Sequence, residues 1–114
     1  MIKGSFKRTG SGRIVSFELT GHAEAGPYGS DVVCAAVSAL AISTVNGIDA
    51  LAGFEPIVEV DDVVGGYLYV EMLTTVNQEQ KNIAQILLEN LLLGLQSIEN
   101  ENTEFIQIKT ITEK

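Results

Sequence analysis

The chain has 114 residues and a mass of 12.2 kDa, which is the size of one ordinary domain. Apolar residues make up 46% of it and the mean hydropathy is +0.23, enough to fill one compact core, which excludes extensive disorder. Seven Lys and Arg against fifteen Asp and Glu give a net charge of −8 and an isoelectric point near 4.4. This sign argues against direct binding to nucleic acid or to an anionic membrane surface.

The charged residues are unevenly distributed. No Lys or Arg occurs between Arg13 and Lys81, whereas ten acidic residues lie from Glu18 to Glu79. We therefore expect one large anionic surface, which would favour a basic partner through electrostatic steering and charge pairing. Acidity that serves solubility alone is the alternative.

The longest apolar run indicates a helix and not a membrane span. Val32 to Ile48 contains 17 residues without a charge, slightly fewer than the roughly 20 that cross a bilayer. The run is rich in Ala, Ser, Thr and Asn, and Asp31 and Asp49 flank it where Lys or Arg anchors are typical. We expect a helix buried on most sides. Because Cys34 is the only cysteine and the N-terminus lacks a signal-peptide pattern, we expect a reducing, cytoplasmic location.

Alternating and turn-forming residues predict the elements of the first half. Ile2 to Lys7 and Ile14 to Leu19 alternate between apolar and polar residues, and Thr9 to Gly12 supply a turn, so together they form a β-hairpin. A glycine-rich stretch follows and leads into a helix from Val32 to Leu51, for which Gly53 provides the end.

The second half contains a further hairpin and a second helix. Ile57 to Asp61 and Tyr67 to Met72 pair across Gly65-Gly66. Asn77, followed by Gln80, forms a capping box that opens the second helix. Its broad apolar stripe either contacts a second subunit or is more fully buried in the monomer. The stripe comprises Ala84, Leu87, Leu88, Leu91, Leu92, Leu95 and Ile98, widened by Ile83, Ile86 and Leu93.

The order of these elements predicts the fold class. Glu104 to Ile111 supplies the last strand, so the order is ββαββαβ. Because hairpins replace alternating βαβ units, we expect one α+β domain spanning residues 1–114. It should contain a mainly antiparallel sheet of about five strands and two long helices.

One segment combines the residue types of nucleophilic catalysis. His22, the only histidine, follows the end of a predicted strand, and Cys34 falls in the first turn of a helix that Ser30 or Asp31 would cap. The Gly and Pro residues between His22 and Ser30 can fold the chain back so that the imidazole meets the sulfur.

This pair has the chemistry of a cysteine hydrolase. A helix N-terminus stabilises an anion by roughly 0.3 to 1 kcal/mol, which is too little to activate a thiol alone. An imidazolium in contact with the sulfur stabilises the anion further and gives an activated thiolate. The thiolate then attacks a peptide carbonyl, while His22 protonates the leaving amine and later acts as base for thioester hydrolysis. Free backbone N–H groups at the start of the Cys34 helix are candidate oxyanion donors.

The residues of this segment also have alternative roles. Asp31 caps the helix or orients His22, and Ser38, one turn after Cys34, hydrogen-bonds within the site or only packs the helix against the sheet. A lone cysteine in an apolar helix is often a small buried hydrophobe, and a redox-sensing thiol is a further alternative. Zinc-ligand spacings are absent from the sequence, so we expect no metal and no other cofactor.

At these residues the sequence resembles the ribosomal-processing cysteine proteases of the Prp family. The resemblance lies in Gly21-His22-Ala23, in Tyr28-Gly29 and in the run from Asp31 to Leu40, and the element order and chain length extend it over essentially the whole chain. It implies a cytoplasmic, homodimeric endopeptidase that removes a short N-terminal extension from large-subunit ribosomal protein twenty-seven, in bacteria whose copy carries one.

The resemblance also implies roles for individual residues. His22 and Cys34 match the catalytic pair and Asp31 the nearby acidic position, and the target has aromatic residues before the cut, a small residue after it and lysines beyond. Ala23 to Ser30 corresponds to a mobile segment that closes over the peptide, although Pro27 restricts it.

We expect Gly21, Gly26 and Gly29 to act as hinges of that segment. A β-branched residue at Gly21 would then slow turnover more than it lowers stability.

The charge distribution supports a second hypothesis, in which the protein is a binding protein and not an enzyme. A non-enzymatic ribosome-assembly factor could bind a basic ribosomal protein through its acidic face. Its binding would be sensitive to salt and indifferent to alkylation of Cys34, whereas a protease of this kind needs the thiol.

Overall fold

The computed structural model describes residues 1–21, 29–61 and 66–113. They form β1 (Ile2–Arg8), β2 (Ile14–Thr20), α1 (Gly29–Gly47), the short π-helix η1 (Ile48–Ala52), β3 (Ile57–Val60), β4 (Tyr67–Glu71), α2 (Gln78–Glu101) and β5 (Ile106–Thr112). This order confirms the predicted ββαββαβ arrangement of an α+β domain.

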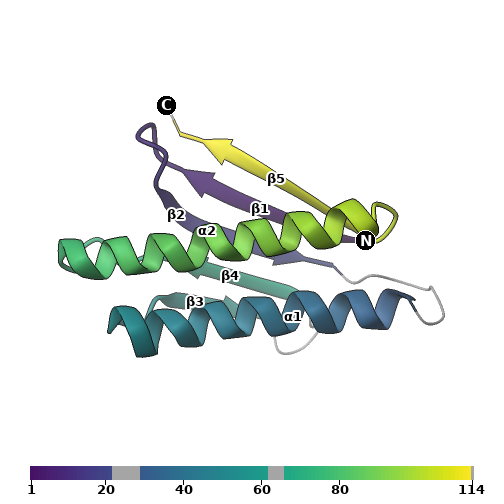
Figure 1. Ribbon diagram of the computed structural model, residues 1–114, viewed down its shortest axis with the longest axis horizontal. Helices are drawn as coiled ribbons and strands as arrows, with labels where there is room; N and C mark the ends of the chain where they lie inside the picture. Colours follow the sequence, from purple (N-terminus) through teal and green to yellow (C-terminus); the bar gives the residue numbers. More distant parts are fainter. Residues whose placement is uncertain (22–28, 62–65, 114) are drawn as a thin grey trace.

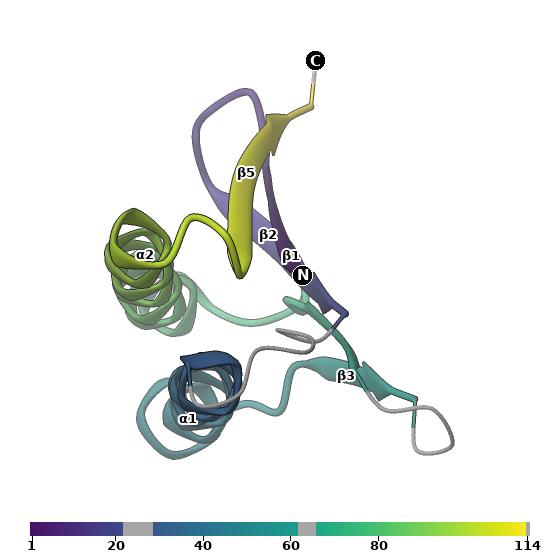
Figure 2. The same ribbon diagram turned by 90° about the vertical axis from the view of Figure 1, so that its right-hand side faces the viewer.

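The strands form one five-stranded sheet in the order β3-β4-β2-β1-β5. Three of its four neighbouring pairs are antiparallel, as predicted, and β1 pairs with β5 in parallel. Both helices lie on the same side of the sheet (Figures 1 and 2). The core therefore lies between one sheet face and a layer of two helices.

Alternation along the strands directs one set of side chains into this core. On β1, Ile2 and Phe6 are buried, whereas Lys3 and Lys7 are exposed. Phe6 lies opposite Phe17 of β2, and the two rings stack with their centroids 5.5 Å apart. Aromatic pairs across neighbouring strands stabilise a sheet beyond the area that they bury. The pair thus fixes the register of the first hairpin.

The first helix is buried along one stripe only. Its inward residues recur every three or four positions, as expected for one helical face. They are Val33, Val37, Ala41 and Thr44, and Ile48 of η1 continues the stripe. On the outer side, Val32 and Ile42 are 68% and 58% exposed. The expectation of a helix buried on most sides is therefore wrong, because only one face packs against the sheet and α2.

The apolar, partly exposed first helix can be compared with a helix that spans a membrane. By length and composition, Val32–Ala52 passes the test for a helix that could cross a membrane, with 28% of its most apolar window buried. A core helix of a soluble protein passes the same test, so one such helix is weak evidence.

The predicted helix ends are confirmed at two positions. Gly53 adopts a left-handed φ of 79° and donates its backbone N–H to the carbonyl of Ile48 at 3.0 Å. At the start of α2, the Asn77 side chain accepts from the Gln80 N–H at 2.9 Å, and the Gln80 side chain accepts from the Asn77 N–H at 3.0 Å. The capping box thereby satisfies two N–H groups that the helix itself leaves unpaired.

The apolar stripe of α2 is largely buried against the sheet and α1. Its fully buried members are Ala84, Leu88, Leu91, Leu92 and Leu95. Ile86 and Leu93 remain 69% and 63% exposed. The stripe is therefore wider than the face that the monomer covers.

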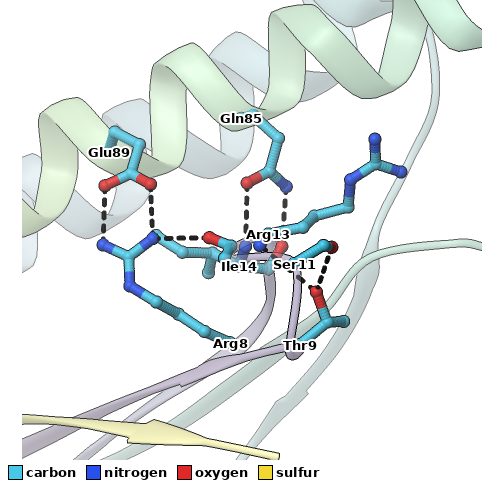
Figure 3. A network of polar contacts seen from close by, with 8 residues as sticks. Arg8, Thr9, Ser11, Arg13, Ile14, Gln85 and Glu89 are labelled. Carbon is cyan, nitrogen blue, oxygen red and sulfur yellow. Dashed lines mark hydrogen bonds and ion pairs between the residues drawn. The ribbon is translucent and has the colours of Figure 1, made fainter.

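Polar contacts attach α2 to the first hairpin (Figure 3). The Arg8 guanidinium donates to both carboxylate oxygens of Glu89, at 2.5 and 2.8 Å. One turn earlier, the Gln85 amide accepts from the Ile14 N–H at 2.8 Å and donates to the Ile14 carbonyl at 2.7 Å. These contacts fix α2 along the sheet and so position the helix layer.

The Arg8–Glu89 pair predicts a pH-dependent contribution to stability. The hydrogen bond from Arg8 lowers the pKa of Glu89 below its ordinary value of 4.5. A lowered folded-state pKa stabilises the fold above that ordinary value, and the contribution is lost as the pH falls through the lowered one. We expect Glu89→Gln to lower the free energy of unfolding by about 0.5 to 1 kcal/mol at pH 7, because solvent screens this half-exposed pair.

Urea unfolding at pH 7 and pH 3 measures this difference. Glu104→Gln, at an exposed position between α2 and β5, is the control and should change the free energy of unfolding little at either pH. A Glu89→Gln deficit that is as large at pH 3 as at pH 7 would contradict the assignment.

Candidate active site

Cys34 lies further inside its helix than expected. Because α1 begins at Gly29, Cys34 is the sixth residue of the helix and belongs to its second turn. Ser30 and Asp31 are helical residues as well, so the prediction that one of them caps the helix is wrong. The favourable field of a helix N-terminus falls off within the first turn. An activated thiolate at this position therefore depends mainly on another group.

Cys34 lines a pocket of about 300 Å³ between α1 and one end of the sheet. From α1, four further residues contribute: Val37, Ser38, Ala41 and Ile42. The opposite wall comes from the strands, mainly through Leu19, Val60 and Leu68. The half-buried sulfur therefore lies beside a largely apolar space that Ser38 also lines, while a supporting role of Ser38 stays a prediction.

The end of β2 leads to the same pocket. Gly21, the residue immediately before His22 in the sequence, lines the pocket together with Cys34. Its N–H donates to the carbonyl of Gly66 at 2.7 Å, and its φ is +84°. A Cβ at this position would overlap the Met1 carbonyl oxygen. Gly21 is therefore required by backbone geometry and by close packing, which the hinge hypothesis did not include.

The other predicted site residues fall partly outside the described structure. His22 and Gly26 lie outside the described residues, as does the Asp31 side chain. Gly29 is the first residue of α1 and not a position within a loop. The structure thus brings Gly21, Cys34 and Ser38 to one pocket, while the pairing of His22 with Cys34 stays a prediction.

Acidic residues lie at the same end of the sheet as this pocket, but on the face that points away from the helices, because Glu18 and Glu59 alternate with the pocket residues Leu19 and Val60. Tyr67 lines the pocket and donates its hydroxyl to the Glu18 carboxylate at 3.3 Å. Loss of hydration and then the negative charge of Glu18 raise the pKa of Tyr67, so its phenol stays protonated at neutral pH. Glu59 adds a further negative charge at this phenol. The outer face at this end of the sheet therefore favours a ligand with positive charge, whereas the pocket itself is largely apolar.

Sequence reasoning did not identify the strand-side residues of the pocket. Val60 and Leu68 are opposite each other in the β3–β4 pair, and both line it. Residues that are directly opposite in an antiparallel pair share one face of the sheet. The predicted pairing of these two strands therefore already indicated which of their residues share a face. It did not indicate that α1 packs above that face.

A second pocket, of about 480 Å³, lies at the opposite end of the sheet. Its wall includes Lys7, Arg13, Glu71 and Lys81, but neither the thiol nor Ser38. Within the three described ranges, no group of three or more His, Cys, Asp or Glu is placed to hold a metal ion. Of these two pockets, only the one of about 300 Å³ is lined by Cys34, so chemistry at the thiol is assigned to that pocket.

Known proteins are similar to this chain in sequence and in architecture. Residues 1–107 match the family described as cysteine protease Prp. The ribosomal processing cysteine protease Prp of Bacillus subtilis (strain 168) is 36% identical over 110 residues, covering 96% of this chain and 97% of that protein. The corresponding protein of Staphylococcus aureus (strain Mu50) is 37% identical over 97 residues, covering 85% of this chain and 87% of its own.

Solved structures extend the similarity to three dimensions. A Streptococcus mutans crystal structure superposes with a TM-score of 0.87 at 37% identity, over 99% of this chain and 96% of the other. The essential ribosomal processing protease Prp of S. aureus, in complex with a covalently linked product peptide, gives a TM-score of 0.83 at 34% identity, over 96% and 99% of the two chains. With the thiol at the pocket and the family match over nearly its full length, the chain belongs to the Prp family of cysteine proteases.

Proposed function

We propose that this chain is an endopeptidase that removes the N-terminal extension of a basic large-subunit ribosomal protein, number twenty-seven. In this proposal Cys34 is the nucleophile and His22 the acid–base residue. The observation that carries it is the position of Cys34 at a pocket that Gly21, the neighbour of His22 in the chain, also lines. A relative at 34% identity holds a covalently linked product peptide, which is consistent with a covalent mechanism.

The chemistry follows from these two side chains. The imidazole of His22 takes the thiol proton, and the sulfur attacks the carbonyl carbon of the scissile peptide bond. Backbone N–H groups that α1 leaves unpaired, at its first four residues, are candidate donors to the resulting oxyanion. His22 then protonates the departing amine and assists water in hydrolysing the thioester. Asp31 and Ser38 are supporting residues in this proposal.

The apolar pocket and the acidic outer face at the same end of the sheet support a particular cleavage site. Apolar walls formed by Leu19, Val37 and Leu68 suit a large apolar side chain. The proposed target has aromatic residues before the cut, and the small residue and lysines beyond it suit an acidic surface. Glu18 and Glu59 provide negative charge at this end of the sheet.

We further propose that the enzyme acts as a homodimer. Five large apolar side chains of the helix layer are more than half exposed in the monomer, namely Val32, Ile42, Leu51, Ile86 and Leu93. Exposed apolar surface of this kind is typical of protein interfaces. Sedimentation velocity measures the oligomeric state directly.

Intact-mass spectrometry of the extended ribosomal protein tests the activity. Incubation under reducing conditions should shorten the substrate at one bond, and prior alkylation of Cys34 with iodoacetamide should abolish the cleavage. The substrate could instead stay uncleaved although Cys34 still reacts with iodoacetamide, and form a stoichiometric, salt-sensitive complex with the protein. That result would support the non-enzymatic assembly factor. The absence of Lys and Arg between Arg13 and Lys81 is the observation that favours this second function.

A further inference from the structure

The edge strand nearest to the Cys34 pocket is unusually open. β3 ends the sheet and pairs only with β4 among the described residues. All four of its residues are exposed. An exposed strand edge presents backbone N–H and C=O groups to any extended peptide, and proteins usually protect such edges. The uncovered side of β3 is therefore available as a template for another strand.

The side chains of β3 connect this edge to the thiol pocket. Val58 is opposite the buried Val70, and Val60 is opposite Leu68, which places both valines on the helix-facing side of the sheet. Val58 and Val60 are 43% and 54% exposed, and Val60 itself lines the Cys34 pocket. An apolar strip therefore begins at Val58 and ends beside the sulfur.

Charge along β3 favours one kind of occupant. Glu55, Glu59 and Asp61 lie on or next to the strand, and no Lys or Arg occurs in the sequence between Arg13 and Lys81. A second copy of this chain, added edge to edge, would bring the acidic residues of two β3 strands together, which destabilises such a pair. A peptide that contains lysines would meet opposite charge instead.

We propose that the peptide substrate binds as an additional strand on the outer edge of β3. This inference rests on the proposed function and specifies how that substrate is held. Main-chain hydrogen bonds to β3 provide affinity that depends little on sequence, and alternate side chains of the peptide contact the strip of Val58 and Val60. The strand leads the scissile bond to Cys34, while basic side chains lie near Glu59 and Asp61.

An amide scan of the substrate tests the main-chain part. A fluorogenic peptide that spans the cleavage site and the following lysines is synthesised in versions that each carry one N-methylated amide. In an added strand, only every second amide faces the neighbouring edge. We expect kcat/KM to fall about three- to tenfold at alternate positions, as for the loss of one hydrogen bond. Losses without a period of two would overturn the proposal.

A matched pair of variants tests the protein side. Val58→Lys places a positive charge on β3, and Ile111→Lys places one on β5, the opposite edge, where the exposure is similar at 46%. Val58→Lys should weaken binding of the unmodified peptide about tenfold, because a lysine repels the basic peptide and removes apolar contact. Ile111→Lys should leave binding unchanged. Equal effects of the two would overturn the proposal.

Further readouts separate the outcomes. Peptide binding is measured by fluorescence polarisation in a Cys34→Ala background, and cleavage is measured separately with Cys34 intact. A peptide that binds in the first assay but stays uncleaved in the second refutes the proteolytic function and not the docking edge. Equal melting temperatures and, with Cys34 intact, equal alkylation rates by iodoacetamide show that Val58→Lys leaves the fold and the thiol unaltered. Conversion of a dimer to a monomer by Val58→Lys would assign the edge to a subunit interface and overturn the proposal, as would failure of the peptide to bind.

Discussion

Replacing Cys34 with serine is expected to lower kcat/KM for the extended ribosomal substrate at least about a thousandfold. A hydroxyl is a far weaker acid than a thiol, so the same imidazole cannot generate a comparable nucleophile from it. Because serine is close in size to cysteine and the position is only half-buried, the melting temperature should change by a few degrees at most. Single-turnover cleavage followed by mass spectrometry measures the loss.

Two companion variants make this test specific. Ser38→Ala alters the same pocket one helical turn away and should cost only a few-fold in kcat/KM. His22→Ala should cost as much as Cys34→Ser, and the double variant no more than either, because residues of one catalytic unit are strongly non-additive. A fully active Cys34→Ser protein would refute the mechanism.

Gly21→Val is expected to lower the free energy of unfolding by about 3 kcal/mol. The left-handed backbone at a φ of +84° is unfavourable for any side chain, at roughly 1 to 2 kcal/mol. In addition, the new Cβ would meet the carbonyl oxygen of Met1, so the chain has to shift. The structure therefore predicts a loss of stability as well as of turnover, in contrast to the hinge hypothesis.

Gly12→Val is the control for this variant. Gly12 has a similar φ of +93°, but nothing lies within 4 Å of the position of its Cβ. It should therefore show the backbone cost alone, about 1 to 2 kcal/mol. The difference between the two variants in urea unfolding isolates the contact with Met1. Equal losses of unfolding free energy in the two variants would show that the chain moves away from Met1 at no cost in stability.

Much of the fold follows from local patterns in the sequence. The alternation from Ile2 to Lys7 predicts a strand because one sheet face is covered and the other is not. Asn77 and Gln80 determine where α2 begins, and Gly53 determines where the first helical segment ends, since each satisfies a particular backbone group. Cues of this kind act within a few residues and need no knowledge of tertiary structure.

Features that depend on packing at a distance could not be predicted in this way. The apolar run from Val32 to Ile48 indicates a helix buried on most sides, but only residues that face the sheet and α2 are covered, and Ile42 stays exposed. Nothing local to Ser30 or Asp31 marks the earlier start of α1. The Cys34 pocket likewise needs Val60 and Leu68, which the sheet brings to the thiol from distant parts of the chain.

The parallel pairing of β1 with β5 has a consequence for folding during synthesis. Ile2 pairs with Ile106, so this contact closes a loop that contains nearly the whole polypeptide. Contacts of such large sequence separation form slowly, because the entropy of loop closure is lost before they stabilise the chain. During translation β1 emerges from the ribosome long before its neighbour β5. A nascent chain therefore leaves one side of β1 without its strand neighbour until β5 has been synthesised, and the sheet is completed only after that.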